Sequence, residues 1–269
     1  MREARHPAQL PLLCQGSLLR DRRRIRSVFE GSREAFGSER IWMALKRGDD
    51  GGEPGCTSEK VARRIMREEG LVAIHDKRRR RCSPCKGEIG AHPGDKVARS
   101  FHADAPNRLR LADIAQFTLP GFKCRLSVIA GCFDGEAVSH ELSRSPNAEP
   151  ADPALVEAVR KLEGDDRPVL HSDCGRRCRW PGRIGICDEY GIARSMSKKA
   201  CSPGDAACEG FFGRLENEFF YHRSWDGMAF ENFSRMLNGC IGCCNTQRRK
   251  KSLGWKSPEE HRLFLGNAA

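Results

Sequence analysis

Three consecutive runs of strand-forming residues constrain the fold of this chain more than any other feature. They are apolar and separated by short turns, and they cover residues 109–119, 122–133 and 137–142. The pattern then alternates, with a helix over 153–162, a strand over 168–172 and a helix over 205–221. Successive strands followed by alternating helices and strands predict a mixed α/β sheet flanked by helices.

A separate helical domain is predicted ahead of this sheet. Apolar residues at near-helical spacing indicate one helix within residues 32–46, and the glycines that follow end it. Thr57 or Ser58 can cap a second helix, which Gly70 ends. Two short helices about a glycine-rich turn are typical of a helix-turn-helix, so we expect a small all-α domain over residues 32–76.

The second of these helices has a basic face. Its basic residues lie opposite the apolar ones: Lys60, Arg63, Arg64 and Arg67. Such a face can enter the major groove of DNA, although an ordinary amphipathic hairpin with a solvated basic surface has the same pattern. The residues alone leave both interpretations open.

Positive charge is concentrated towards the N-terminus. The net charge is +11, and residues 1–100 hold 23 Lys and Arg against 14 Asp and Glu. We expect a poorly ordered basic arm over residues 1–31, and a basic linker over 77–100 that includes Arg78 and Arg79. A basic N-terminal part joined to a nearly neutral part over 101–269 suits a phosphate-binding module attached to a catalytic one.

The sequence has no apolar run of the roughly 18 residues needed to cross a bilayer, and no secretory signal pattern at its start. We therefore expect a cytoplasmic protein, associated with the bacterial nucleoid and not with a membrane. Its 14 cysteines are expected to be reduced thiols.

Three acidic residues stand where a fold of this class can bring them together. Asp113 lies within the first strand, Asp173 directly follows the strand over 168–172, and Glu209 lies in the first turns of the last predicted helix. An acid inside an apolar strand is costly to bury unless it faces an edge or binds a cation. Magnesium prefers carboxylate oxygens, and three converging acids can hold two such ions for phosphoryl transfer. Three acids among 36 are weak evidence by themselves.

The residues around those acids resemble the integrase-core transposases of bacterial insertion sequences, in particular the downstream-frame (orfB-type) product of insertion-sequence family three. The similar segments run in order along the chain: 36–41, 61–71, 106–107, 112–114, 171–175, 195–199, 206–212, Asn245, Arg248, 253–254 and 257–258. The spacing agrees as well, since 35 residues separate Asp173 from Glu209. Several ordered motifs at the right spacing are far more specific than any one of them.

This resemblance implies a ribonuclease-H-like catalytic core over residues 101–269 with a C-terminal helical extension. It implies that Asp113, Asp173 and Glu209 are both the catalytic residues and the ligands of Mg²⁺ or Mn²⁺, with two ions expected when DNA is bound. The implied reaction nicks transposon ends and transfers the freed 3′-hydroxyl to a target phosphodiester. Expected DNA contacts are Lys60, Arg63, Arg64, Arg67, Arg78, Arg79, Lys198, Lys199 and Arg248. The expected partners are DNA, further copies of the chain on that DNA, and a protein from the upstream reading frame.

The chain also departs from the family pattern. Arg110, Cys178, Cys243 and Cys244 stand where the family usually has tyrosine or tryptophan, and Glu216 stands where it typically has a lysine that can hold phosphate. A degenerate copy accumulates such changes. The alternative function is therefore a catalytically weak or inactive remnant that still binds DNA.

A zinc module is a third interpretation of the cysteines. Cys82 with Cys85, and Cys240 with Cys243, each have the spacing of metal ligands. The two pairs lie far apart in the sequence, and the first falls in the basic linker. We therefore do not expect zinc.

Overall fold

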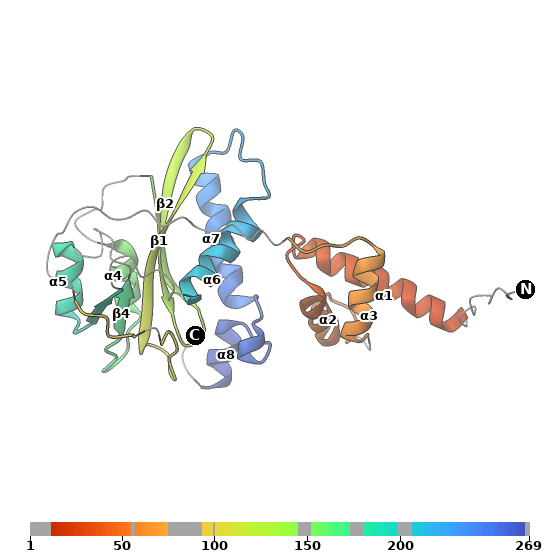
Figure 1. Cartoon of the computed structure of the whole chain (residues 1–269), viewed down its shortest axis with the longest axis horizontal. Helices are drawn as coiled ribbons and strands as arrows, with labels where there is room; N and C mark the ends of the chain where they lie inside the picture. The colour runs from red at the N-terminus through yellow and green to blue at the C-terminus, as the bar shows by residue number, and fades with distance from the viewer. Residues whose placement is uncertain are drawn as a thin grey trace, which may run out of the picture. The chain divides into compact units, whose positions relative to one another are not determined.

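The computed structural model of the chain describes residues 12–54, 57–74, 93–98, 100–144, 152–172, 180–197 and 206–266, without the side chains of 12–17 and 206–209. It divides into two compact units, residues 1–78 and 79–269 (Figure 1). Each unit has a hydrophobic core of its own, and each is described by itself below.

The N-terminal unit consists of three helices, α1 (Leu12–Gly31), α2 (Ser38–Arg47) and α3 (Glu59–Glu68). The two predicted helices are confirmed as α2 and α3. Helix α2 ends at Gly48, whose φ of 75° is a left-handed conformation that favours glycine. Helix α3 begins after Ser58, whose side chain accepts a hydrogen bond from the Val61 amide at 3.3 Å.

The expectation of a poorly ordered arm over residues 1–31 is wrong for residues 12–31, which form α1. Ile25 and Phe29 of α1 are buried and pack with α2 and α3 in one core. The arginines of α1 obscured this face in the sequence, but they too have partners. Arg24 donates hydrogen bonds to Asp50 at 2.6 and 2.7 Å, and Arg22 donates one to Glu69 at 2.7 Å. Helix α1 is therefore an integral part of this unit.

The C-terminal unit is built on a five-stranded sheet. Its strands are β1 (Leu109–Leu119), β2 (Phe122–Gly131), β3 (Ala137–Ser143), β4 (Val169–Ser172) and β5 (Ala193–Met196). The spatial order is β3-β2-β1-β4-β5, with β2 antiparallel to β1 and β3, and with β1, β4 and β5 parallel to one another. This order confirms the ribonuclease-H-like mixed sheet, because three antiparallel strands come first and two parallel strands extend the sheet beside β1.

Helices cover both faces of the sheet (Figure 1). On one face, α4 (Pro153–Arg160) and α5 (Pro181–Glu189) pack on a core that includes Ala112 and Leu170. On the other face, α6 (Ala206–Leu215), its π-helical continuation η2 (Glu216–Phe220) and α7 (Phe230–Thr246) pack on the larger core. Alternate residues of β1 therefore contact different helices. Leu111, Ala115 and Phe117 face α6 and α7.

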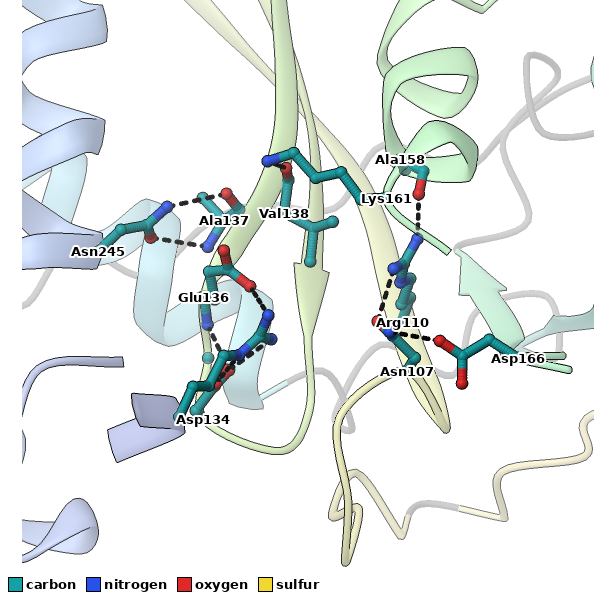
Figure 2. Close-up of polar contacts among 12 residues, drawn as sticks. Asn107, Arg110, Asp134, Glu136, Ala137, Val138, Ala158, Lys161, Asp166 and Asn245 are labelled. Atoms are coloured by element: carbon teal, nitrogen blue, oxygen red, sulfur yellow. Dashed lines mark hydrogen bonds and ion pairs between the residues drawn. The ribbon is translucent and has the colours of Figure 1, made fainter. Parts of the chain in front are cut away.

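The C-terminal part of the chain is bonded to β3, which is one of the two edge strands of the sheet. The Asn245 side chain, from α7, accepts a hydrogen bond from the Ala137 amide at 2.9 Å and donates one to the Ala137 carbonyl at 3.0 Å (Figure 2). A short η3 (Lys251–Leu253) and α8 (Pro258–Phe264) follow, and Ser257 with Glu260 forms a capping box at the start of α8. Among the described residues, no helix is long and apolar enough to cross a membrane.

Candidate active site and nucleic-acid interface

Asp113 lies in the middle of β1, on the face that α6 and α7 cover. Its neighbours at alternate positions, Leu111 and Ala115, are buried in the core beneath those helices, whereas Asp113 itself is half-buried. One carboxylate oxygen accepts a hydrogen bond from the Ile114 amide at 2.7 Å. The carboxylate is therefore on the sheet surface with partial access to water.

Strand β4 ends beside Asp113. In the parallel pairing of β1 with β4, Ala112 lies opposite Ser172, the last residue of β4. Asp173 lies outside the described residues. The backbone of Glu209 is described, as part of α6, but its side chain is not.

Helix α6 is fixed against the same face of the sheet by its aromatic residues. Phe211, Phe212 and Leu215 are buried in the core that contains Leu111 and Ala115. Glu209 precedes Phe212 by three residues, so it lies one turn earlier on the helix. The structure thus places the end of β4 beside Asp113 and packs α6, from Phe211 onward, on the same face of the sheet, while two of the three predicted carboxylates lie outside the described side chains. Within the described residues, no group of three His, Cys, Asp or Glu side chains could hold a metal ion.

His171 links the strands next to this region. It is buried, and its ring nitrogens lie 2.9 Å from the Ser195 hydroxyl and 3.0 Å from the Ser197 hydroxyl. The Ser195 hydroxyl also accepts a hydrogen bond from the Lys96 amide, and Phe101 packs edge-on against the imidazole. His171 therefore joins β4, β5 and the segment before β1.

The basic residues of α3 lie on its outer surface. Ala62, Ile65 and Met66 are buried, and the four predicted DNA contacts on this helix are exposed: Lys60, Arg63, Arg64 and Arg67. Arg63 forms an ion pair with Glu59, and Arg64 lies 3.6 Å from Glu68. Lys60 and Arg67 are seven residues apart, about two turns, and therefore share a face of the helix.

Arg248 is the predicted DNA contact that the structure does not support. Its side chain is 10% exposed, and its guanidinium forms a two-pronged hydrogen bond with the Glu218 carboxylate, one prong at 2.6 Å. A planar guanidinium satisfied in this way has little capacity left for a phosphate. Arg248 instead joins the end of α7 to η2, and we leave it out of the proposed interface. Arg78, Arg79, Lys198 and Lys199 lie outside the described residues.

Comparison with known proteins identifies the family. An HTH-like domain model matches residues 19–81, beginning within α1. The probable transposase for insertion sequence element IS1353 of Shigella flexneri is 40% identical over 242 residues, which cover 90% of this chain and 46% of that protein. The putative transposase InsK for element IS150 of Escherichia coli K12 is 30% identical, over 90% of this chain and 82% of that protein. This chain belongs to the insertion-sequence transposases.

The family assignment confirms the resemblance seen in the sequence motifs. The chain spans less than half the length of the Shigella flexneri transposase, but most of the Escherichia coli one. Among solved structures, the magnesium complex of the HTLV-2 integrase catalytic core domain is 18% identical, with a TM-score of 0.44, over 60% of this chain and 98% of that one. At that level of likeness the fold assignment rests on the strand order of the sheet.

Arg110, one departure of this transposase from its family pattern, is buried in the structure. Arg110 is 3% exposed on β1, and its guanidinium donates to the Ala158 carbonyl at 2.5 Å and to the Asn107 side chain at 2.6 Å (Figure 2). The Asn107 amide in turn donates to Asp166 at 2.7 Å. Burial lowers the pKa of Arg110 to about 10. The Arg110 Nε has no hydrogen-bond partner within the part of the chain that the structure describes.

The turn between β2 and β3 is held by charges from the C-terminal extension of the transposase. Asp134 and Glu136 in that turn lie 2.6 Å from the guanidinium of Arg262 in α8 (Figure 2). Lys250 donates to the carbonyls of Asp134 at 2.7 Å and Gly135 at 2.9 Å. No sequence signal near either segment pointed to this pairing, because more than a hundred residues separate the partners.

Proposed function

We propose that this transposase chain cleaves and joins DNA strands by metal-dependent phosphoryl transfer, with Asp113, Asp173 and Glu209 as the ligands of two Mg²⁺ or Mn²⁺ ions. The observation that carries the proposal is the meeting of three chain segments. Asp113 lies on the face of β1 that α6 covers, and β4 ends opposite Ala112. Asp113 lies in β1, Asp173 directly follows β4 in the sequence, and Glu209 belongs to α6.

Covalent geometry supports a position for Asp173 near Asp113. Consecutive Cα atoms lie about 3.8 Å apart, so the Cα of Asp173 lies within that distance of Ser172, which pairs with the residue next to Asp113. Glu209 lies one turn before Phe212, which is buried against the same face of the sheet. These positions fit a shared site of hard oxygen ligands, the kind that Mg²⁺ and Mn²⁺ prefer.

When bound, a pair of such ions activates an attacking water or 3′-hydroxyl and stabilises the departing oxygen of an in-line displacement. The contribution of the chain is to hold the carboxylates in place. The β1–β4 pairing supports this role for Asp113 and for the end of β4, and the buried Phe211 and Phe212 hold α6 against the sheet. The proposed strand cleavage and transfer would need no covalent intermediate between protein and DNA.

The N-terminal unit is proposed to bind DNA through the outer face of α3. Lys60, Arg63, Arg64 and Arg67 present a basic surface of the size of a major-groove contact, and Arg78 and Arg79 extend it along the sequence. Lys198 and Lys199, shortly before α6, are proposed to contact the DNA near the catalytic site. Further copies of the chain and an upstream-frame protein are the proposed partners on that DNA.

The test is a strand-transfer assay. Full-length chain is incubated with labelled candidate transposon ends, a plasmid target and either Mg²⁺ or Mn²⁺. We expect joined products that depend on the metal and that Asp113→Asn, Asp173→Asn and Glu209→Gln each abolish. Products that survive Asp113→Asn would refute the assigned site.

The alternative is a remnant that binds DNA without catalysis. The observation that favours it is the buried guanidinium of Arg110, at a position where the family usually has an aromatic residue. The same assay separates the two functions. A remnant gives salt-dependent binding of DNA, equal for wild type and Asp113→Asn, and no metal-dependent product.

A further inference from the structure

Helix α1 packs beside α3 and carries arginines that are not among the proposed DNA contacts. Ile25 and Phe29 of α1 share one core with Ile65 of α3. The outer surfaces of the two helices therefore adjoin within the N-terminal unit (Figure 1).

An ion-pair network joins these two surfaces. Glu68 is the last residue of α3, and Glu69 follows it. Arg22 of α1 pairs with both carboxylates, at 2.7 Å from that of Glu69, and Arg26 of α1 pairs with Glu69. Glu68 also lies 3.6 Å from Arg64, one of the proposed DNA contacts. The charged surface of α3 therefore continues onto α1.

Arg26 is the arginine of α1 in this network that can still bind an anion. Its side chain is 49% exposed, and within the described part of the chain it donates one hydrogen bond, from Nη2 to Glu69. A guanidinium has five N–H donors, so several of them remain for a phosphate. Arg22 differs, because each of its terminal nitrogens is bonded to a carboxylate.

The dimensions of DNA place a helix beside α3 over a phosphate strand. Packed helices lie about 8–10 Å apart, and the major groove is about 12 Å wide. When α3 occupies the groove, a helix whose outer surface adjoins its basic face therefore lies over one of the two strands that border the groove. Donors on that helix meet phosphates and not base edges, so their contacts carry no sequence preference.

We propose that Arg26 binds a phosphate of the DNA strand that borders the groove, and that Glu69 positions its guanidinium. This inference rests on the proposed binding of DNA by α3 and adds a second helix to that interface. Glu69 also weakens the contact, because its negative charge repels the phosphate. One such repulsion at about 4 Å in water corresponds to about a fivefold loss of affinity.

The experiment measures binding of the full-length chain to a labelled DNA duplex of arbitrary sequence, by fluorescence anisotropy over a salt series. Arg26→Ala should reduce the slope of log K against log salt by about 0.9, the value for one phosphate contact. Arg26→Lys keeps the charge and should keep the wild-type slope. Arg20→Ala is the matched control, because Arg20 is an exposed arginine of the same helix about 120° around its axis from Arg26, and it should leave the slope unchanged.

Glu69→Gln separates a phosphate contact from an ion pair that only supports the fold. Removing the carboxylate charge should strengthen binding about fivefold at low salt. An ion pair that only joins α1 to α3 predicts unchanged or weaker binding instead, and that result would overturn the proposal.

Lys60→Ala in the same series distinguishes the two ways in which the proposal can fail. A reduced slope for Lys60→Ala with a wild-type slope for Arg26→Ala would overturn the contact by α1 and leave α3 as the DNA-binding helix. Wild-type slopes for both variants would overturn DNA binding by α3 as well. Equal losses for Arg26→Ala and Arg26→Lys would show that Arg26 acts through folding and not through its charge, which also contradicts the proposal.

Discussion

Arg110 puts a guanidinium inside the C-terminal unit with neutral hydrogen-bond partners, the Ala158 carbonyl and the Asn107 side chain. Replacing a buried charge by an apolar side chain of similar volume is often neutral or stabilising. We therefore expect Arg110→Met to raise the free energy of unfolding by about 1 kcal/mol. Urea denaturation, with an unchanged slope and a higher midpoint, measures this. A loss of more than about 2 kcal/mol would show that the Asn107–Asp166 bonds depend on Arg110.

Lys250 makes the free energy of unfolding of the transposase depend on pH, and the direction follows from its pKa. Burial lowers the pKa of Lys250 to about 8 from its ordinary 10.5. Between those two values the unfolded chain binds more protons than the folded one, so this group makes the protein more stable as the pH rises from about 8 to 10.5. Lys250→Met should remove that contribution. The free energy of unfolding of the wild type, minus that of Lys250→Met, should therefore be larger at about pH 10 than at about pH 7.5. No shift, or the opposite one, would contradict the assigned pKa.

Arg248 shows where single residues escaped the sequence. The family resemblance implied a DNA contact for Arg248, but its partner Glu218 lies 30 residues earlier on a π-helical turn. The pairing depends on how η2 meets α7, which no local pattern encodes.

At the scale of elements, Arg262 of α8 forms ion pairs with Asp134 and Glu136 of the β2–β3 turn. The Asp134 side chain is 0% exposed and that of Arg262 10% exposed. Removing one partner leaves an uncompensated buried charge, so Arg262→Met should cost about 3–5 kcal/mol. Arg160 pairs with Glu157 on the exposed side of α4, and Arg160→Met is the matched control, with an expected cost below about 1 kcal/mol. Equal effects of the two substitutions in thermal unfolding would contradict this account.

Helix α3 is the element proposed to contact DNA. Each phosphate contact that is lost should reduce the slope of log K against log salt by about 0.9. Lys60→Ala and Arg67→Ala should each do so and weaken binding to duplexes of any sequence. Lys123→Ala, which removes an exposed charge on β2, is the control and should leave the slope unchanged. Fluorescence anisotropy over a salt series measures it, and wild-type slopes for the α3 variants would exclude this helix.

The elements that the sequence predicted are those with strong local patterns. Strand β1 was predicted with its observed bounds, and α3 with a cap at Thr57 or Ser58, of which Ser58 is the observed one, because alternation and capping are local signals. Helix α1 was missed, since Ile25 and Phe29 lie among arginines whose partners follow α3 and α2 in the sequence. Helix α5 contains Gly182 and Gly185, which weaken a helical signal, and β5 is only four residues long.

For the whole molecule, sequence motifs predicted a helical part ahead of a mixed sheet, but not the contacts that support the sheet. The motifs named Asp113, Asp173 and Glu209 as the site, which stays a prediction, and the β1–β4 pairing places the end of β4 beside Asp113. The supporting contacts came only from the fold. Asn245 holds the edge of β3, Arg262 holds the turn before it, and both arise from chain segments that are remote from β3 in sequence.

The division into two units predicts that core damage remains local. Ile65 is buried in the core of α1, α2 and α3, and Leu237 in the core between the sheet and α7. A cavity at either position should cost about 2–5 kcal/mol in its own unit. In hydrogen–deuterium exchange, Ile65→Ala should therefore accelerate amides of α1, α2 and α3 and leave those of β1, β2 and α7 at wild-type rates. Leu237→Ala is the reciprocal control and should give the reverse pattern. Faster exchange in β1 or α7 caused by Ile65→Ala would mean that the cores are energetically coupled, since a local cavity changes exchange only in residues that unfold with it.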